Sequence, residues 1–171
     1  MALFKKRVTC AQMGIIVCET ARIRCENFYK ECEEKELDFK PAALQVYTFV
    51  YNYFFISKVL LKKYNYETVK KIMQTAYDVF IKMSKEIFSA AQMRKLENDI
   101  LFTFDWLNDI YSFGEDRGAF DNPIYNISKM FIEDITGESV YDIVLQTEIQ
   151  VEISAWIKFS DFLLTEYKVV D

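Results

Sequence analysis

The chain contains 171 residues, of which 51% are hydrophobic and 16% aromatic, and it carries a formal net charge of −5. A chain of this length can bury a core of its own, and a composition this apolar excludes an intrinsically disordered protein. Four glycines and two prolines are too few for the turns of a β-sandwich or a doubly wound sheet, and the chain has no histidine, the commonest general base and transition-metal ligand.

The spacing of apolar residues predicts an all-α fold, a single-domain bundle of five or six helices over residues 1–171. Only a short basic stub at residues 1–7 is expected ahead of the first helix. Pro41 suits the first position of a helix, and Asn65 suits an N-cap. The expected helices cover residues 8–36, 41–63, 65–88, 89–113, 123–137 and 139–167.

The second expected helix, at about residues 41–63, is apolar on nearly every side and is therefore predicted to be the centre of the bundle. Its few polar side chains and two of its tyrosines form a candidate ligand pocket: Gln45, Tyr47, Thr48, Tyr51 and Asn52. Buried amides and hydroxyls need hydrogen-bond partners, which a bound small molecule can supply. The alternative is an internal network in which these groups bond to other side chains.

The first expected helix carries a stripe of mostly small residues at alternating spacings of three and four: Ala11, Gly14, Cys18, Ala21, Cys25, Phe28 and Cys32. Small side chains let two helices approach closely, so we expect this face to pack on the central helix. The alternatives are a contact between two copies of the chain, which would make a homodimer, and a redox sensor. The cysteines are too far apart along one helix for disulfides, and free thiols are typical of a reducing cytoplasm.

Carboxylates are the only plentiful catalytic groups, and they leave a magnesium-dependent all-α hydrolase as an alternative function. Such enzymes pair a Glu-x-x-Glu element with a Glu-x-x-Asp element. Glu31 and Glu34 supply the first element, but no second element follows in the fourth expected helix, where Asp105 and Asp109 lie on a polar face. We therefore expect no enzyme activity, no metal and no cofactor.

The basic N-terminus and the longest apolar runs bear on localisation. Lys5-Lys6-Arg7 precedes an uncharged stretch, as in a bacterial signal region. The polar residue Gln12 interrupts the apolar character that such a region needs. The uncharged run at residues 41–57 is shorter than a membrane span. The sequence has no other tight basic run of the kind that favours nucleic-acid binding. We expect a cytoplasmic protein that binds neither a membrane nor a nucleic acid.

Charge is distributed unevenly along the chain. Residues 114–171 carry four basic and twelve acidic side chains, a net charge of −8. We interpret the chain as a non-catalytic helical protein that acts by protein–protein interaction, as an adaptor, inhibitor or immunity-type regulator. Its partner is expected to be a protein with a basic surface, attracted by the acidic third. The first alternative is a small-molecule sensor with an aromatic pocket beside the central helix.

The segment at residues 114–122 is the one clear loop in the sequence, and it combines turn residues, an aromatic side chain and dense charge. We predict that four of its residues border the partner-binding surface: Glu115, Asp116, Phe120 and Asp121.

Reversing Glu115 and Asp116 to lysine is expected to slow association with a basic partner and to weaken the salt dependence of the on-rate. The reason is that fewer opposite charges then steer the encounter. Surface plasmon resonance at several salt concentrations measures both quantities. On-rates equal to those of the parent protein would place the contact surface elsewhere.

Overall fold

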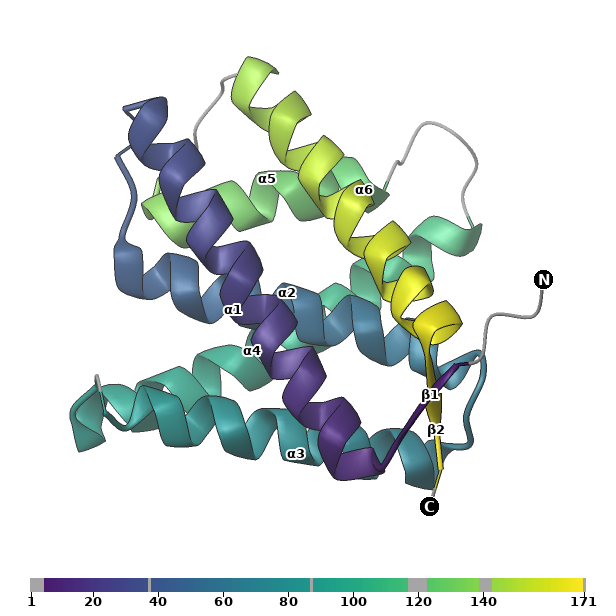
Figure 1. Ribbon diagram of the computed structural model, residues 1–171. Coiled ribbons are helices and arrows are strands. Elements are labelled where there is room, and N and C mark those ends of the chain that lie inside the picture. The colour runs from purple at the N-terminus through teal and green to yellow at the C-terminus, as the bar shows by residue number, and fades with distance from the viewer. Residues whose placement is uncertain (1–4, 37, 87, 117–122, 139–142, 171) are drawn as a thin grey trace.

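The computed structural model describes the chain except for residues 1–4, 37, 87, 117–122, 139–142 and 171. The described residues form six helices and two short strands (Figure 1). In chain order the elements are β1 (Lys6–Val8), α1 (Cys10–Glu34), α2 (Pro41–Leu61), α3 (Tyr66–Ser84), α4 (Ala90–Asp116), α5 (Pro123–Thr136), α6 (Ile143–Glu166) and β2 (Tyr167–Val169). The all-α fold predicted from the sequence is confirmed.

Local signals determine where three of the helices begin. At α1 the Thr9 hydroxyl accepts a hydrogen bond from the Gln12 N–H at 3.2 Å, and the Gln12 side chain accepts one from the Thr9 N–H at 2.9 Å. Pro41 lies in the first turn of α2. At α3 the Asn65 side chain accepts from the Thr68 N–H at 2.9 Å. The side chains of Thr9, Gln12 and Asn65 thereby satisfy N–H groups that have no partner within their own helix.

The central position of α2 is also confirmed. The other five helices all pack against α2, and α1 and α6 cross over it on the face shown in Figure 1. Phe49 of α2 stacks on Phe80 of α3 with ring centroids 3.8 Å apart, and Tyr51 meets the ring of Phe131 in α5 at 4.9 Å. Among the described residues, no helix combines the length and the apolarity needed to cross a bilayer.

The two ends of the described chain pair with each other. β1 and β2 are parallel, with Lys6 opposite Tyr167 and Val8 opposite Val169. The basic stub expected ahead of the first helix is therefore partly a strand. Val8 is buried in that strand instead of opening the helix, which begins at Cys10.

The fourth helix runs further than the sequence predicts. It continues through Gly114 to Asp116, so Glu115 and Asp116 belong to α4 and not to a loop. A single glycine weakens a helix by only about 1 kcal/mol relative to alanine, and it need not end one. The side chains of Glu115 and Asp116 are not described, and Phe120 and Asp121 lie outside the described residues. Their role at a partner-binding surface stays a prediction.

The stripe of small residues on α1 contacts two neighbours. At its N-terminal end Gly14 packs on α3, where an added Cβ would lie 2.6 Å from the carbonyl oxygen of Ile72 and from the Cβ of Thr75. Further along, Cys18 and Ala21 join the core cluster that contains the aromatic residues of α2. The expectation that the whole stripe packs on α2 is therefore corrected at Gly14.

Replacing Gly14 by alanine is expected to destabilise the protein by about 1–3 kcal/mol, the usual effect of overpacking a tight contact. Inside a helix, alanine is normally the more stable residue by about 0.5–1 kcal/mol. Here the added methyl group meets the backbone oxygen of Ile72, which can move only if α1 and α3 separate. Urea denaturation of both proteins measures the difference in the free energy of unfolding.

Ala11→Leu is the matched control, because Ala11 is exposed on α1 one turn before Gly14. This enlargement is expected to change the free energy of unfolding by less than about 0.5 kcal/mol. If Gly14→Ala is as stable as the parent protein or more stable, the close contact between α1 and α3 is wrong.

Candidate functional site

The five α2 residues that the sequence groups into one candidate pocket lie in different surroundings. Gln45 lines a groove between α1, α2 and α3, whereas Tyr47 lines a separate cavity beside α4 and α5. Thr48, Tyr51 and Asn52 are buried in the interior. Residues two apart on a helix point about 200° away from each other, which explains why Gln45 and Tyr47 diverge. Ligand binding by these residues stays a prediction.

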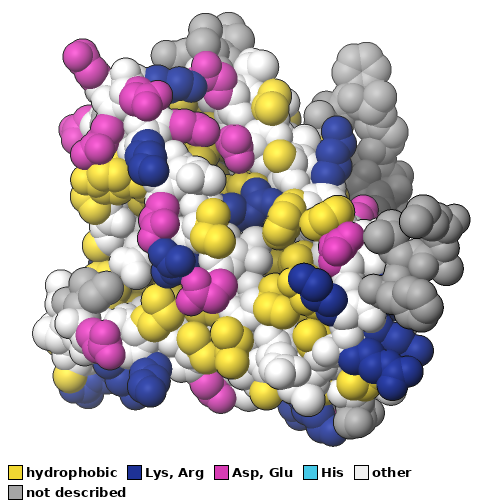
Figure 2. Space-filling view, viewed as in Figure 1, with side chains coloured by type: hydrophobic (Ala, Val, Ile, Leu, Met, Phe, Trp, Pro, Cys, Tyr) yellow, Lys and Arg dark blue, Asp and Glu magenta, His cyan; other side chains and the backbone are white. Residues whose placement is uncertain are grey.

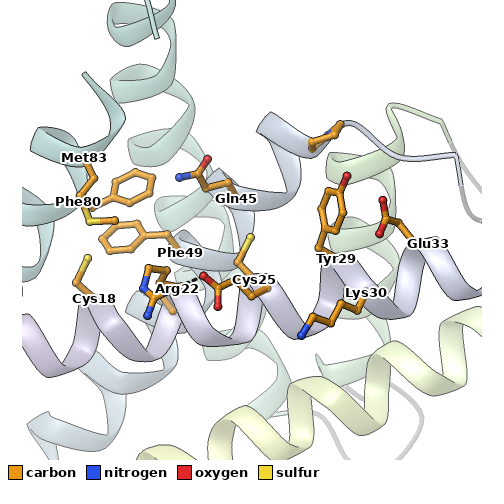
Figure 3. A pocket seen from close by; sticks show the side chains of 13 residues that line it. Cys18, Arg22, Cys25, Tyr29, Lys30, Glu33, Gln45, Phe49, Phe80 and Met83 are labelled. Atoms are coloured by element: carbon orange, nitrogen blue, oxygen red, sulfur yellow. Dashed lines mark hydrogen bonds and ion pairs between the residues drawn. The ribbon is translucent and has the colours of Figure 1, made fainter. Parts of the chain in front are cut away.

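The groove between α1, α2 and α3 has a volume of about 670 Å³ and is lined mainly by apolar side chains (Figure 3). Cys18, Phe49, Phe80 and Met83 gather at one end of it, and Tyr29 lies towards the other end. The helices contribute these residues because α1 presents small side chains where α2 presents large aromatic ones. The groove can therefore receive apolar groups along one side of α1.

Charged side chains of α1 border this groove. Arg22 forms ion pairs with Glu19 and Glu26, and Lys30 and Glu33 follow further along the same helix. These side chains are exposed to solvent, so their ion pairs contribute little to stability. They give the groove a rim that carries both signs of charge.

The thiols in the groove are held in the neutral form. Burial raises the pKa of Cys18 and of Cys25 to about 11. The Thr48 hydroxyl lowers the pKa of Cys25 and so opposes the effect of burial. It does so without a hydrogen bond of ordinary geometry to a described residue. Thiolate is therefore scarce near neutral pH, and these two cysteines lack the activation that redox or nucleophilic chemistry requires.

A buried carboxyl group, that of Asp134 in α5, contacts α2 outside the groove. The Tyr51 hydroxyl donates a hydrogen bond to Asp134 Oδ2 of α5 at 3.0 Å. Burial, followed by the negative charges of Glu133 and Asp99, raises the pKa of Asp134 to about 7 against the opposing effect of the Tyr51 hydrogen bond. Burial and the neighbouring Asp134 raise the pKa of Tyr51 well above 10, so its hydroxyl stays protonated and able to donate.

Asp134 lines the cavity of about 360 Å³ that also contains Tyr47. Lys40, Lys95 and Asp99 reach the same cavity, so an acid that exchanges its proton near neutral pH faces charges of both signs. This arrangement can hold a small polar ligand or release a proton. The sequence analysis did not select Asp134 because it follows Glu133. Two adjacent acidic residues usually indicate a helix face that is exposed to solvent.

Acidic and basic side chains occupy different parts of the face shown in Figure 2. Acidic side chains gather over the C-terminal half of α1 and the start of α6, and basic side chains gather at the corner beside the strands. In that corner the nearby side chain of Lys63, two residues after α2, lowers the pKa of Lys5. Arg7 lies opposite Lys168 in the strand pair. The fold thus adds lysines to the basic N-terminal run, and the absence of nucleic-acid binding stays a prediction.

The carboxylates considered for a magnesium site are dispersed. Asp105 and Asp109 are exposed on α4, as expected for a polar face, and Glu34 is exposed at the end of α1. Within the part of the chain that the structure describes, no three cysteine or carboxylate side chains are grouped so that they could hold a metal ion.

Comparison of the chain with protein-family models, with curated proteins and with solved structures finds no match. The function therefore has to be inferred from the residues and geometry of this chain.

Asp134 is expected to make stability depend on pH. The folded protein keeps this carboxyl protonated up to about pH 7, whereas the unfolded chain releases the proton near pH 3.8. The contribution of protonated Asp134 to the stability of the folded protein is complete below pH 3.8 and is lost as the pH rises through about 7. Over this range the free energy of unfolding falls by up to about 1.4 kcal/mol per pH unit. Asp134→Asn is expected to remove this slope, as measured by urea denaturation between pH 4 and pH 8.

Asp105→Asn, at an exposed position on α4, is the control and should retain the slope of the parent protein. Parallel stability profiles for Asp134→Asn and the parent would show that Asp134 titrates at an ordinary pKa.

Proposed function

We propose that this chain is a non-catalytic binding protein that acts by protein–protein interaction, with an amphipathic helix of its partner lying in the groove between α1, α2 and α3. The observation that carries the proposal is the groove itself, which has apolar walls and a charged rim. Grooves of this composition bind helices by receiving apolar side chains at positions i, i+3, i+4 and i+7.

The length of the groove favours a helix. Its lining on α1 extends from Cys18 to Glu33, which at 1.5 Å per residue is about 22 Å, or four helical turns. Along that length α1 contributes the small side chains of Ala21 and Cys25, which let a second helix axis come close.

The distribution of charge supports a partner with a basic surface. Acidic side chains gather over the C-terminal half of α1 and the start of α6, and Glu26 and Glu33 of that half line the groove. Residues 114–171 add a net charge of −8. Such a field speeds the encounter with a positively charged protein more than it increases the final affinity. A role as adaptor, inhibitor or immunity-type regulator would need only this surface.

A small-molecule sensor is the second candidate, and the volume of the groove favours it. A cavity of about 670 Å³ lies within the usual range for small-ligand sites, about 300–1,000 Å³. The stacked rings of Phe49 and Phe80 form an aromatic wall at one end, and Gln45 offers a polar group beside them. This candidate and the helix share the same surface, so one set of variants tests both.

Filling the groove is expected to abolish partner binding. Ala21→Leu and Cys25→Leu each add methylene groups to the wall that the partner helix contacts. Peptides of about four turns, selected from a displayed library of amphipathic helices, should bind either variant about tenfold or more weakly, equivalent to about 1.4 kcal/mol. Fluorescence anisotropy measures the affinity, and thermal unfolding checks that each variant is folded.

Phe102→Ala is the matched control, because Phe102 is 73% exposed on α4 and lies outside the groove. Peptides that lose affinity for this control but not for the filled grooves would place the interaction on α4 and overturn the proposal. An apolar dye such as anilinonaphthalene sulfonate that binds the groove of the parent, with no selected peptide competing, would favour the small-molecule sensor.

A further inference from the structure

A second cavity lies between α1 and α6, with a volume of about 500 Å³. Its apolar walls come from Ile23 and Phe28 of α1 and from Phe159 of α6. Its charged groups are Arg24, Lys30 and Glu31 of α1 and Glu152 of α6. The cavity thus combines apolar surface with both signs of charge in a volume suited to a small molecule.

Arg24 is held in this cavity by aromatic rings. Its Cζ lies 5.6 Å from the ring centroid of Trp156 and 5.0 Å from that of Phe159. Among the described residues Arg24 has no hydrogen bond and no ion pair, and its Nε is buried without a partner. Burial lowers the pKa of the guanidinium to about 10 against the opposing effect of the Glu152 charge, so it remains charged at neutral pH. Stacking orients the planar group and leaves its N–H donors for an anion.

Two carboxylates lie in the same cavity. Burial, followed by the negative charge of Glu152, raises the pKa of Glu31. The neighbouring Glu148 already has a cation, because it forms an ion pair with Lys35. Glu31 and Glu152 form no ion pair with a described residue, so a ligand that brings a positive charge would relieve their repulsion.

These charges select against simple ions. A phosphate would be repelled by Glu31 and Glu152, and a metal ion or amine alone would be repelled by Arg24 and Lys30, so either ligand meets repulsion as well as attraction. A molecule with a carboxylate at one side and an ammonium at the other satisfies both sets. The apolar walls leave room for an apolar substituent on that molecule.

We propose that the cavity between α1 and α6 binds a free α-amino acid with an apolar side chain. Its carboxylate pairs with Arg24, its ammonium pairs with Glu31 and Glu152, and its side chain packs on Ile23, Phe28 and Phe159. The proposal does not depend on the helix-binding groove, because Arg24 and Glu152 are absent from the lining of that groove.

Calorimetric titration of the full chain with three probes tests the charge requirement. L-leucine should bind, whereas N-acetyl-L-leucine, without the ammonium, and L-leucinamide, without the carboxylate, should each bind about tenfold or more weakly. Equal binding of the acetylated probe would mean that the site reads a carboxylate alone, as at a peptide C-terminus. Equal binding of the amide would mean that it reads an ammonium alone, and either result overturns the proposal.

Variants locate the site. Arg24→Gln and Glu152→Gln should each weaken L-leucine binding by about tenfold or more, and Arg24→Lys should recover only part of the affinity because it lacks the planar fork. Arg94→Gln, at an exposed position on α4, should bind like the parent protein. Circular dichroism checks that each variant is folded.

Unchanged affinity in a folded Arg24→Gln or Glu152→Gln variant overturns the proposal. So does the absence of heat with L-leucine, L-methionine and L-phenylalanine at millimolar concentrations. If Arg24→Gln does not fold, the three leucine probes and Glu152→Gln still decide between the outcomes.

Discussion

Burial of α2 is the constraint on which the rest of the molecule depends. A helix with apolar side chains on nearly every side cannot border water, so the other helices must supply surfaces that cover it. They do so largely with aromatic side chains, as where Phe131 of α5 meets both Tyr51 of α2 and Trp156 of α6. The groove and the two cavities lie where the surrounding helices do not fill the space beside α2 or beside a helix that packs on α2.

The position of α1 links two of these sites. Its N-terminal end is held against α3 at Gly14, and its C-terminal half then runs away from α3 across α2 (Figure 1). One side of that half borders the groove through Ala21 and Cys25, and the other side borders the α6 cavity through Arg24. Lys30 lines both. Any shift of α1 that tightens one cavity must therefore change the other.

The sequence predicts the helices well because their signals are local. Asn65 caps its helix within one turn, and the apolar periodicity needs no knowledge of neighbours. The capping pair of Thr9 and Gln12 is equally local, but the helix predicted from the apolar periodicity begins at residue 8 because it does not take this pair into account. The pairing of β1 with β2 depends on contacts between opposite ends of the chain, which no local pattern encodes. The five candidate pocket residues on α2 lie in different surroundings because residues two apart on a helix, such as Gln45 and Tyr47, point about 200° away from each other.

Arg24 and Asp134 escaped sequence reasoning because burial, not residue type, makes them unusual, and burial is a tertiary property. Both are charged groups in positions that penalise charge, which is where functional sites concentrate. They differ in how the penalty is relieved. Asp134 accepts a hydrogen bond from Tyr51 and can neutralise itself by taking up a proton near pH 7. The guanidinium of Arg24, with a pKa of about 10, stays charged at neutral pH, and the negative charge of Glu152 opposes only part of the effect of burial. Arg24 therefore supports the proposal that the cavity between α1 and α6 binds a ligand that carries a negative charge.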